Sequence, residues 1–193
     1  GVECDRVQLD IQAGDTRQPA FLAINPNGRV PAITHDGTAI WESAAITMYL
    51  GETFGVRDGL YPAPGPKRGE AMAWIVWSNV SLAEAAGRFA AALPPGSPGA
   101  VEPGSRDWVP PAERSPRAAE TAARDLTQCL AILDGRLAVQ PFLVGAYTLA
   151  DTHVQGFVGW IGSMAVDLSP FSHVVGWMER CSARPALAQL RAD

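Results

Sequence analysis

Two short groups of residues in the first third of the chain have the types and spacing to hold a small zwitterionic peptide. The first is Val30-Pro31. A proline in a strand cannot donate to the ladder, so it belongs at an edge or a bulge. If this bond is cis, the amide and carbonyl of Val30 turn outward and can hold a peptide as one more strand. The second is Glu42-Ser43, at the start of a predicted helix. Free amides and the helix dipole there attract a carboxylate, and Glu42 can accept from an ammonium group.

Each of these residues also has a purely structural interpretation. Pro31 can be a fold-determining cis proline with no ligand. Ser43 can be only a helix cap, and Glu42 only an exposed acid that the dipole favours in a first turn. Their occurrence together in one short stretch favours the binding interpretation.

The stretch that positions them predicts turn, strand, turn, strand and helix. Residues 25–28 read N-P-N-G, a dense turn signal, and a short apolar strand follows over 29–34. Asp36-Gly37 is the dipeptide of a tight hairpin, and residues 38–41 give the return strand. A helix over residues 42–55 completes the stretch, with an apolar face at helical spacing.

The string N-P-N-G-R-V-P-A-I, followed by D-G and W-E-S-A-A-I, closely resembles the glutathione-binding segment of soluble glutathione transferases. The resemblance implies an α/β thioredoxin-like domain followed by an all-α helical domain. It implies that Val30 pairs through its backbone with the cysteinyl part of glutathione, before a cis Pro31. It also implies that Glu42 and Ser43 hold the γ-glutamyl end. Arg29 lies where the family often has a polar residue near the glycine end.

The N-terminal part departs from this family pattern. Residues 4–11 alternate as a strand does, but the family has a strand and a full helix before it. Roughly two dozen residues are expected to be missing, judged from the length of a β-α-β unit. The family's catalytic Ser, Tyr or Cys lies in that segment, so the catalytic residue stays unknown. Cys4 is interpreted as a small packed thiol and not as its substitute.

The domain boundaries are predicted from composition and periodicity. Residues 1–60 form the thioredoxin-like domain, residues 61–66 a linker rich in Pro and Gly, and residues 67–193 the helical domain. Helical spacing predicts five helices in the helical domain, over residues 67–93, 117–139, 149–162, 171–182 and 185–190. The predicted buried stripe of the first helix is Met72, Ile75, Val76, Ala83 and Ala86, and that of the second is Ala119, Ala122, Leu126, Leu130, Leu133 and Leu137. Residues 94–116 are rich in Pro, Gly and Ser, which fits either a lid over an apolar site or a disordered surface loop.

Three tryptophans are candidates for lining an apolar substrate pocket. Trp74 and Trp77 lie partly off the predicted buried stripe of the first long helix, and Trp108 lies in the Pro-rich region. The alternative for the first two is packing against the other domain or a second subunit.

A second landmark of the family is the string G-A-Y-T-L-A-D at residues 145–151. Thr148 and Asp151 have the spacing of a capping box, with Asp in the place of the usual Glu or Gln. Asp151 is therefore expected to be structural. Tyr147 faces Thr152 where a hydrophobic staple is usual, so the staple looks weakened.

Bulk properties narrow the function classes. The net charge of −5 argues against the basic face that a nucleic-acid-binding protein needs. No apolar run reaches membrane-spanning length and no signal-peptide pattern is present, so no membrane partner is expected. The three cysteines are scattered, which indicates reduced thiols in the cytoplasm and neither disulfides nor a metal site.

The sequence thus favours a glutathione transferase-like enzyme with glutathione as cosubstrate. It would direct the glutathione thiolate at a small apolar electrophile, whose identity the sequence does not fix. The resemblance also suggests a homodimer. The alternative is a noncatalytic binding or assembly protein with the same fold. A general thioredoxin-like redox protein is disfavoured because no C-x-x-C is present.

Overall fold

The computed structural model describes residues 2–102 and 108–186, and the chain divides into two compact units, Gly1–Tyr61 and Pro62–Asp193. We call these the N-terminal unit and the C-terminal unit. The last helix expected from the sequence, over residues 185–190, falls mostly outside the described residues.

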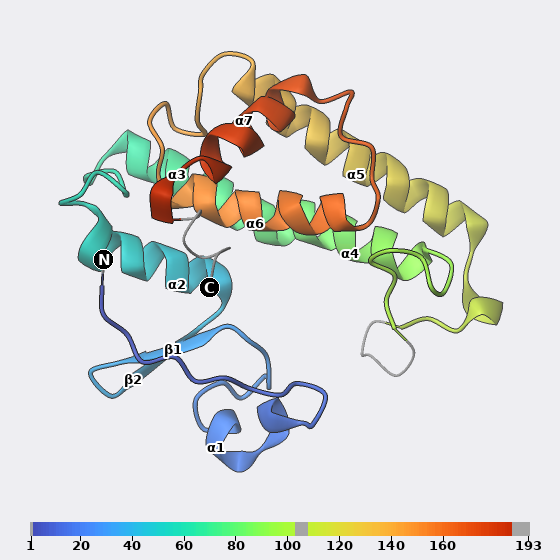
Figure 1. Cartoon of the computed structure of the whole chain (residues 1–193), viewed down its shortest axis with the longest axis horizontal. Helices are drawn as coiled ribbons and strands as arrows, with labels where there is room; N and C mark the ends of the chain where they lie inside the picture. The colour runs from blue at the N-terminus through green and yellow to red at the C-terminus, as the bar shows by residue number, and fades with distance from the viewer. Residues whose placement is uncertain (1, 103–107, 187–193) are drawn as a thin grey trace. The chain divides into compact units, whose positions relative to one another are not determined.

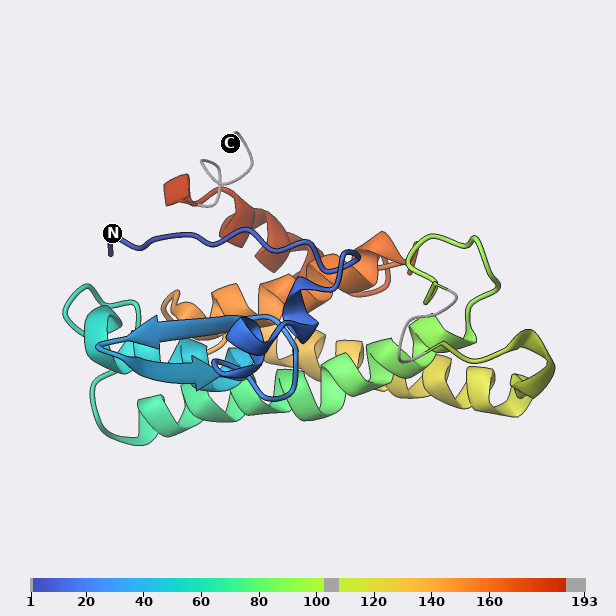
Figure 2. The same cartoon turned by 90° about the horizontal axis from the view of Figure 1, so that it is seen from below.

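A β-hairpin is the centre of the N-terminal unit. Strands β1 (Ala32–His35) and β2 (Thr38–Trp41) run antiparallel, with Ala32 opposite Trp41 and His35 opposite Thr38 (Figure 2). Asp36 and Gly37 both have positive φ, at 49° and 75°. Two central residues with positive φ are the mark of a type I′ turn, which suits the twist of the flanking strands. The hairpin confirms the prediction from the Asp-Gly dipeptide.

Helix α2 (Ser43–Leu50) follows the hairpin and continues as one π-helical turn, η2 (Gly51–Gly55). His35 of β1 hydrogen-bonds through Nδ1 to the hydroxyl of Tyr49 on α2. Tyr61 is only 1% exposed and packs against η2. A Cβ at Gly51 would lie 2.6 Å from the Tyr61 ring, and one at Gly55 would lie 3.2 Å from the Cβ of Tyr61. The two glycines, one helical turn apart, therefore make room for Tyr61.

The strand expected over residues 4–11 does not form. Two short helices follow, η1 (Asp15–Arg17) and α1 (Pro19–Leu22), but residues 2–10 have no regular structure. Within the described part of the chain the only sheet is the two-stranded hairpin. The alternation of apolar and polar residues determines only which face a strand would bury. A strand also needs a neighbouring strand to accept and donate its backbone hydrogen bonds. Val7 is 81% exposed, and Cys4 is exposed as well, so the interpretation of Cys4 as a packed thiol is wrong.

The C-terminal unit opens with a long helix that one π-helical turn interrupts. Helix α3 (Pro66–Trp77) leads into η3 (Ser78–Leu82) and then α4 (Ala83–Ala92). The sequence predicted one helix here, but it did not predict the π turn. Ile75 and Leu82 are fully buried, whereas Val76, expected in the buried stripe, is 43% exposed. Ile75 and Ala86 are buried as predicted, whereas Met72 and Ala83 are half-buried and Val76 faces outward.

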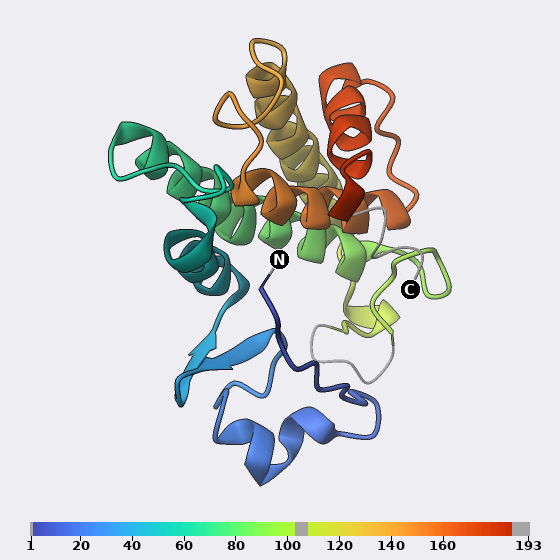
Figure 3. The same ribbon diagram turned by 60° about the vertical axis from the view of Figure 1, so that its left-hand side comes forward.

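Three further α-helices follow in the described part of this unit: α5 (Pro116–Leu137), α6 (Leu149–Ser163) and α7 (Ser172–Ser182). Helix α5 packs against α4 and α7, and α6 packs against α3 and α7 (Figures 1 and 3). The stripe predicted for α5 forms the core, with Ala119 half-buried and five residues buried: Ala122, Leu126, Leu130, Leu133 and Leu137. Periodicity was therefore a reliable guide to the core of this helix.

The start of α6 is held by Asp151, which is fully buried. Thr148 is the N-cap residue and forms the capping box with Asp151, which accepts from the Thr148 amide at 2.9 Å. The other carboxylate oxygen accepts from the Leu143 amide at 2.9 Å and from the Trp177 indole at 3.0 Å. Burial raises the pKa of the Asp151 carboxyl, although these hydrogen bonds act the other way. Tyr147 donates to or accepts from Thr152 through their hydroxyls, 2.8 Å apart.

The described ends of the connection between α4 and α5 are attached to the helices. A Cβ at Gly99 would lie 2.5 Å from the Met164 side chain, so that turn packs closely on the end of α6. A short helix, η4 (Pro111–Glu113), precedes Arg114, whose guanidinium donates to the carbonyls of Leu93 and Val109. Within the described residues no helix is long and apolar enough to cross a membrane.

Candidate functional site

The bond between Val30 and Pro31 is cis, which confirms the prediction from the sequence. Val30 lies just before the hairpin ladder, which begins at Ala32. The residue Val30 is 48% exposed. Neither its amide nor its carbonyl hydrogen-bonds to another residue in the described part of the chain. The backbone of Val30 can therefore accept an extended peptide.

The turn that leads to Val30 is built around Asn25, which is only 2% exposed. Its side-chain oxygen accepts from the amide of Asn27 at 3.0 Å, and its side-chain nitrogen donates to the carbonyl of Arg29 at 2.6 Å. The Asn25 carbonyl accepts from Gly28, which has φ of 63°. The sequence indicated a turn here but not the role of Asn25. The signal in the sequence was an Asn at the start of a run of turn-forming residues, because an Asn side chain can hydrogen-bond to the backbone two residues further on.

Glu42 occupies the N-cap position of α2, and Ser43 is the first helical residue. The interpretation of Ser43 as the N-cap is therefore wrong. A capping serine would precede the first helical residue, whereas Ser43 is itself that residue. Glu42 is exposed and has φ of 70° and ψ of 120°, and its side chain makes no capping bond. A non-glycine residue in such a conformation costs about 1–3 kcal/mol and often belongs to a functional site.

The start of α2 presents backbone amides. The first helical hydrogen bond runs from the Ile46 amide to the Glu42 carbonyl, at 2.9 Å. The amides of Ala44 and Ala45 therefore have no acceptor within the helix. Together with the positive end of the helix dipole they make a site for a carboxylate.

The exposed groups of the N-terminal unit have the chemistry to hold a small zwitterionic peptide. The backbone of Val30 can pair with a peptide, the start of α2 can hold a carboxylate, and the exposed carboxylate of Glu42 can accept from an ammonium group. Arg29 is exposed as well and is a cation next to Val30 in sequence.

Two of the three candidate tryptophans lie together. Trp74 and Trp77 on α3 form an edge-to-face pair, with ring centroids 5.1 Å apart. Trp108 lies in the connection before η4, half-buried, and its indole nitrogen has no hydrogen-bond partner among the described residues. Trp77 lines a groove of about 310 Å³ on one face of α4 and α5. The other residues that line this groove are Val80, Ser81, Glu84, Ala85, Arg88, Asp125, Gln128, Cys129 and Ile132.

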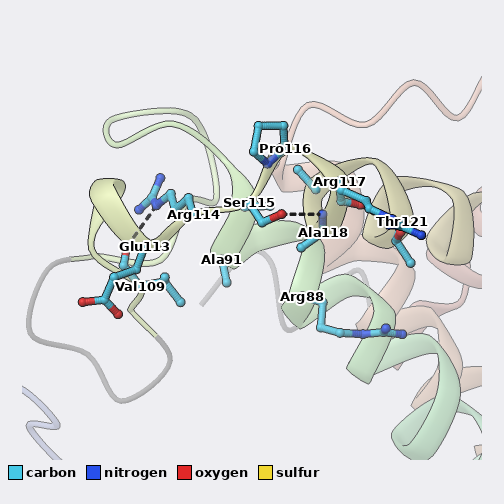
Figure 4. Close-up of a pocket in the computed structure, with 12 residues that line it drawn as sticks. Arg88, Ala91, Val109, Glu113, Arg114, Ser115, Pro116, Arg117, Ala118 and Thr121 are labelled. Carbon is cyan, nitrogen blue, oxygen red and sulfur yellow. Dashed lines mark hydrogen bonds between the residues drawn. The ribbon is translucent and has the colours of Figure 1, made fainter.

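A larger groove of about 750 Å³ lies between the end of α4, η4 and the start of α5 (Figure 4). Its apolar lining is formed by Ala91, Ala92, Val109, Pro116, Ala118 and Ala119, and none of the three tryptophans lines it. Three arginines stand at it: Arg88, Arg114 and Arg117. Arg88 is paired with Asp125 at 3.1 Å, and Arg114 is held by backbone carbonyls. The sequence did not predict this groove, because its lining comes from the end of one helix, the start of another and the segment that precedes the second.

A half-buried histidine and a buried cysteine of the C-terminal unit do not titrate near neutral pH. His153 on α6 hydrogen-bonds through Nε2 to the side-chain oxygen of Asn79 at 2.6 Å. Burial lowers the pKa of His153 to about 4. Burial also raises the pKa of the Cys181 thiol to about 12. His153 is therefore neutral at pH 7 and Cys181 is no thiolate nucleophile.

Comparison with known families decides the relationship. Residues 1–52 match the family model described as "Glutathione S-transferase, N-terminal domain", and residues 88–185 match "Glutathione S-transferase, C-terminal domain". The chain belongs to the glutathione S-transferase family. The fold is accordingly a thioredoxin-like domain followed by a helical domain, as the sequence motifs predicted.

Several members of the family resemble this chain over most of its length. Glutathione S-transferase GstB of Escherichia coli (strain K12) is 27% identical over 173 residues, which are 88% of this chain and 76% of that protein. The crystal structure of the glutathione transferase URE2P6 from Phanerochaete chrysosporium, in complex with oxidized glutathione, has a TM-score of 0.80 at 26% identity. That match covers 96% of this chain and 82% of the other. The theta class enzyme from Xanthomonas axonopodis pv. citri, with glutathione bound, has a TM-score of 0.73 at 28% identity. This second structural match covers 91% of this chain and 78% of the other.

Proposed function

We propose that this member of the glutathione S-transferase family binds glutathione in its N-terminal unit and directs the thiolate at a small apolar electrophile. The observation that carries the proposal is the exposed backbone of Val30, before a cis bond to Pro31, in one compact unit with the start of α2. Relatives solved with glutathione or oxidized glutathione bound add support.

The proposed contacts divide glutathione into three parts. The backbone of Val30 pairs with the cysteinyl part, and Pro31 fixes the direction of the chain after it. Ser43 and the first amides of α2 hold the γ-glutamyl carboxylate, and Glu42 accepts from the γ-glutamyl ammonium group. Arg29 is the proposed contact near the glycine carboxylate.

The chemistry that glutathione supplies when bound is a nucleophilic thiolate. A free thiol has a pKa near 8.5, so only about 3% of it is thiolate at pH 7. A transferase therefore needs a donor that stabilises the thiolate. We assign this role to no residue of the chain. The alternative of a noncatalytic binding protein has no observation in its favour.

For the electrophile we propose contacts in the C-terminal unit. Trp74, Trp77 and Trp108 are the aromatic candidates, and Trp77 has the support of lining a groove. Large aromatic side chains offer apolar area at little cost in conformational entropy. Substituting Trp77 by Ala should raise the KM for an apolar electrophile while the KM for glutathione stays unchanged.

We also propose a homodimer that works in a reducing, cytoplasmic setting. The dimer is the assembly that the resemblance to the family suggests. Cys4, Cys129 and Cys181 are scattered along the sequence, which suits a reducing compartment. Light scattering should give twice the chain mass, and the mass of a single chain would contradict the dimer.

Calorimetric titration with glutathione tests the proposed site. The double substitution Glu42→Ala with Ser43→Ala should weaken binding at least tenfold and leave the far-UV circular dichroism spectrum unchanged. Asp58→Ala is the matched control, because Asp58 is an exposed acid of the same unit whose partner is Arg57. Equal affinity of the double variant and the control would contradict the site. Tight binding with no turnover over a panel of electrophiles would contradict the transferase activity and not the site.

A further inference from the structure

We infer that Asn25 is a positioning residue that sets the direction of the Val30 amide toward glutathione. The inference rests on the proposed function, because it concerns a residue that supports the same site from behind the residues that contact glutathione. Asn25 would touch no atom of the ligand and would act through the backbone of Arg29 and Val30.

Asn25 is buried and fully engaged. Its amide donates to the carbonyl of Phe21 in α1 at 2.8 Å, which attaches the turn to that helix. Its side-chain oxygen accepts from the backbone of Asn27 at 3.0 Å and from the Asn27 side chain at 3.2 Å. Its side-chain nitrogen donates to the carbonyl of Arg29 at 2.6 Å. A polar side chain that is 2% exposed and makes bonds at both ends has one orientation.

The bond to the Arg29 carbonyl determines where the Val30 amide points. The Arg29–Val30 peptide is trans, because the only cis bond recorded among the described residues is the next one, Val30-Pro31. In a planar trans peptide the C=O and the N–H point in opposite directions. A carbonyl of Arg29 that points inward to Asn25 therefore turns the N–H of Val30 outward, where it has no partner within the described chain.

A side chain at this position needs both a donor and an acceptor at a fixed distance. Asp in place of Asn25 would set a carboxylate oxygen against the Arg29 carbonyl, and Ser would be too short to reach it. Serine would still accept from the Asn27 amide, as a serine turn does. Asn25→Ser thus removes the bond to Arg29 and keeps the turn.

The test compares Asn25→Ser with Asn27→Ala. Asn27→Ala removes only the side-chain bond to Asn25 and leaves the backbone bond of residue 27 in place. We expect Asn25→Ser to raise the Kd and the KM for glutathione about tenfold, with kcat at saturating glutathione within twofold of the wild type. Asn27→Ala should change neither. A purely structural role of Asn25 would lower the melting temperature or the active fraction without this separation of KM from kcat.

A second measurement keeps the inference independent of glutathione. The residual dipolar coupling of the Val30 N–H in the ligand-free protein reports the direction of that bond. It should change in Asn25→Ser and stay the same in Asn27→Ala. If the wild type binds no glutathione, the proposed function fails, and this coupling still decides the role of Asn25. An unchanged coupling, or unchanged glutathione affinity in Asn25→Ser, would overturn the inference.

Discussion

Glu42 combines an unfavourable backbone conformation with a position at the proposed site. Its φ of 70° costs a non-glycine residue about 1–3 kcal/mol, and nothing in the helix cap requires its side chain. The neighbouring Ser43 begins α2 without strain. Under the proposed function, this conformation serves to place the Glu42 carboxylate against the ammonium group of glutathione.

Glycine at position 42 separates these two effects. Glu42→Gly should raise the free energy of unfolding by about 1 kcal/mol, because glycine adopts positive φ without a Cβ clash. This value already allows for the greater conformational entropy that glycine loses on folding. The same change should weaken glutathione binding, because the acceptor for the ammonium group is lost. Urea denaturation and calorimetry on one preparation give both values. Lower stability together with unchanged affinity would refute this view of Glu42.

Gly51 is required by the side chain that covers it. A methyl group there would lie 2.6 Å from the Tyr61 ring, and Tyr61 is buried. We expect Gly51→Ala to cost about 1–3 kcal/mol of stability through overpacking. Gly87→Ala is the control, since Gly87 is helical and has no atom near its Cβ position. That control should stabilise the protein by about 0.5–1 kcal/mol. Similar shifts of the melting temperature in Gly51→Ala and Gly87→Ala would show that Tyr61 moves to make room for the methyl group, and would contradict the prediction.

At the scale of the element, the sequence predicted features that local residues determine. The Asp36-Gly37 hairpin follows from one dipeptide and the apolar stripe of α5 from helical spacing within one segment, and both form as predicted. The strand over residues 4–11 fails because a strand depends on a partner elsewhere in the chain. The π turn over Ser78–Leu82 was missed because it is an adjustment to helices packed against it, which helical spacing does not reveal.

The start of α6 depends on a network larger than its cap. Besides the two Thr148 groups, Asp151 accepts from the Leu143 amide and from the Trp177 indole of α7. Asp151→Ala should therefore cost at least about 3 kcal/mol, because several buried donors lose their partner. Thermal or urea denaturation measures this.

Ser115→Ala provides the comparison for an ordinary cap. Ser115 caps α5 by one exposed bond of 3.4 Å to the Ala118 amide. Its loss should cost about 0.5–1 kcal/mol. An Asp151→Ala cost as small as that of Ser115→Ala would mean that Leu143 and Trp177 find other acceptors.

At the scale of the whole molecule, the half-buried His153 should make stability depend on pH. Its folded pKa, about 4, lies below the ordinary value of 6.5. The unfolded chain therefore takes up a proton first as the pH falls. Stability is full above pH 6.5 and is lost between pH 6.5 and 4. After an allowance for partial exposure of the ring, the loss should be about 2 kcal/mol.

His153→Gln isolates this contribution, because glutamine keeps a donor for Asn79 and does not titrate. Asp151 acts in the opposite direction, since burial raises its pKa and its ionisation costs stability as the pH rises. The difference between wild type and His153→Gln removes that background. Urea midpoints at pH 7 and pH 4.5 should differ more in the wild type than in the variant. Equal pH dependence of both proteins would show that His153 is not the group responsible.

The most direct measurement of the central claim is a titration of the ¹⁵N-labelled protein with glutathione, followed by amide NMR. The amides of Val30, Ser43, Ala44 and Ala45 should shift together and saturate at one affinity, while amides of α5 and α7 stay in place. Shifts confined to the C-terminal unit, or no saturable shift at millimolar glutathione, would contradict the site built on Val30 and the start of α2.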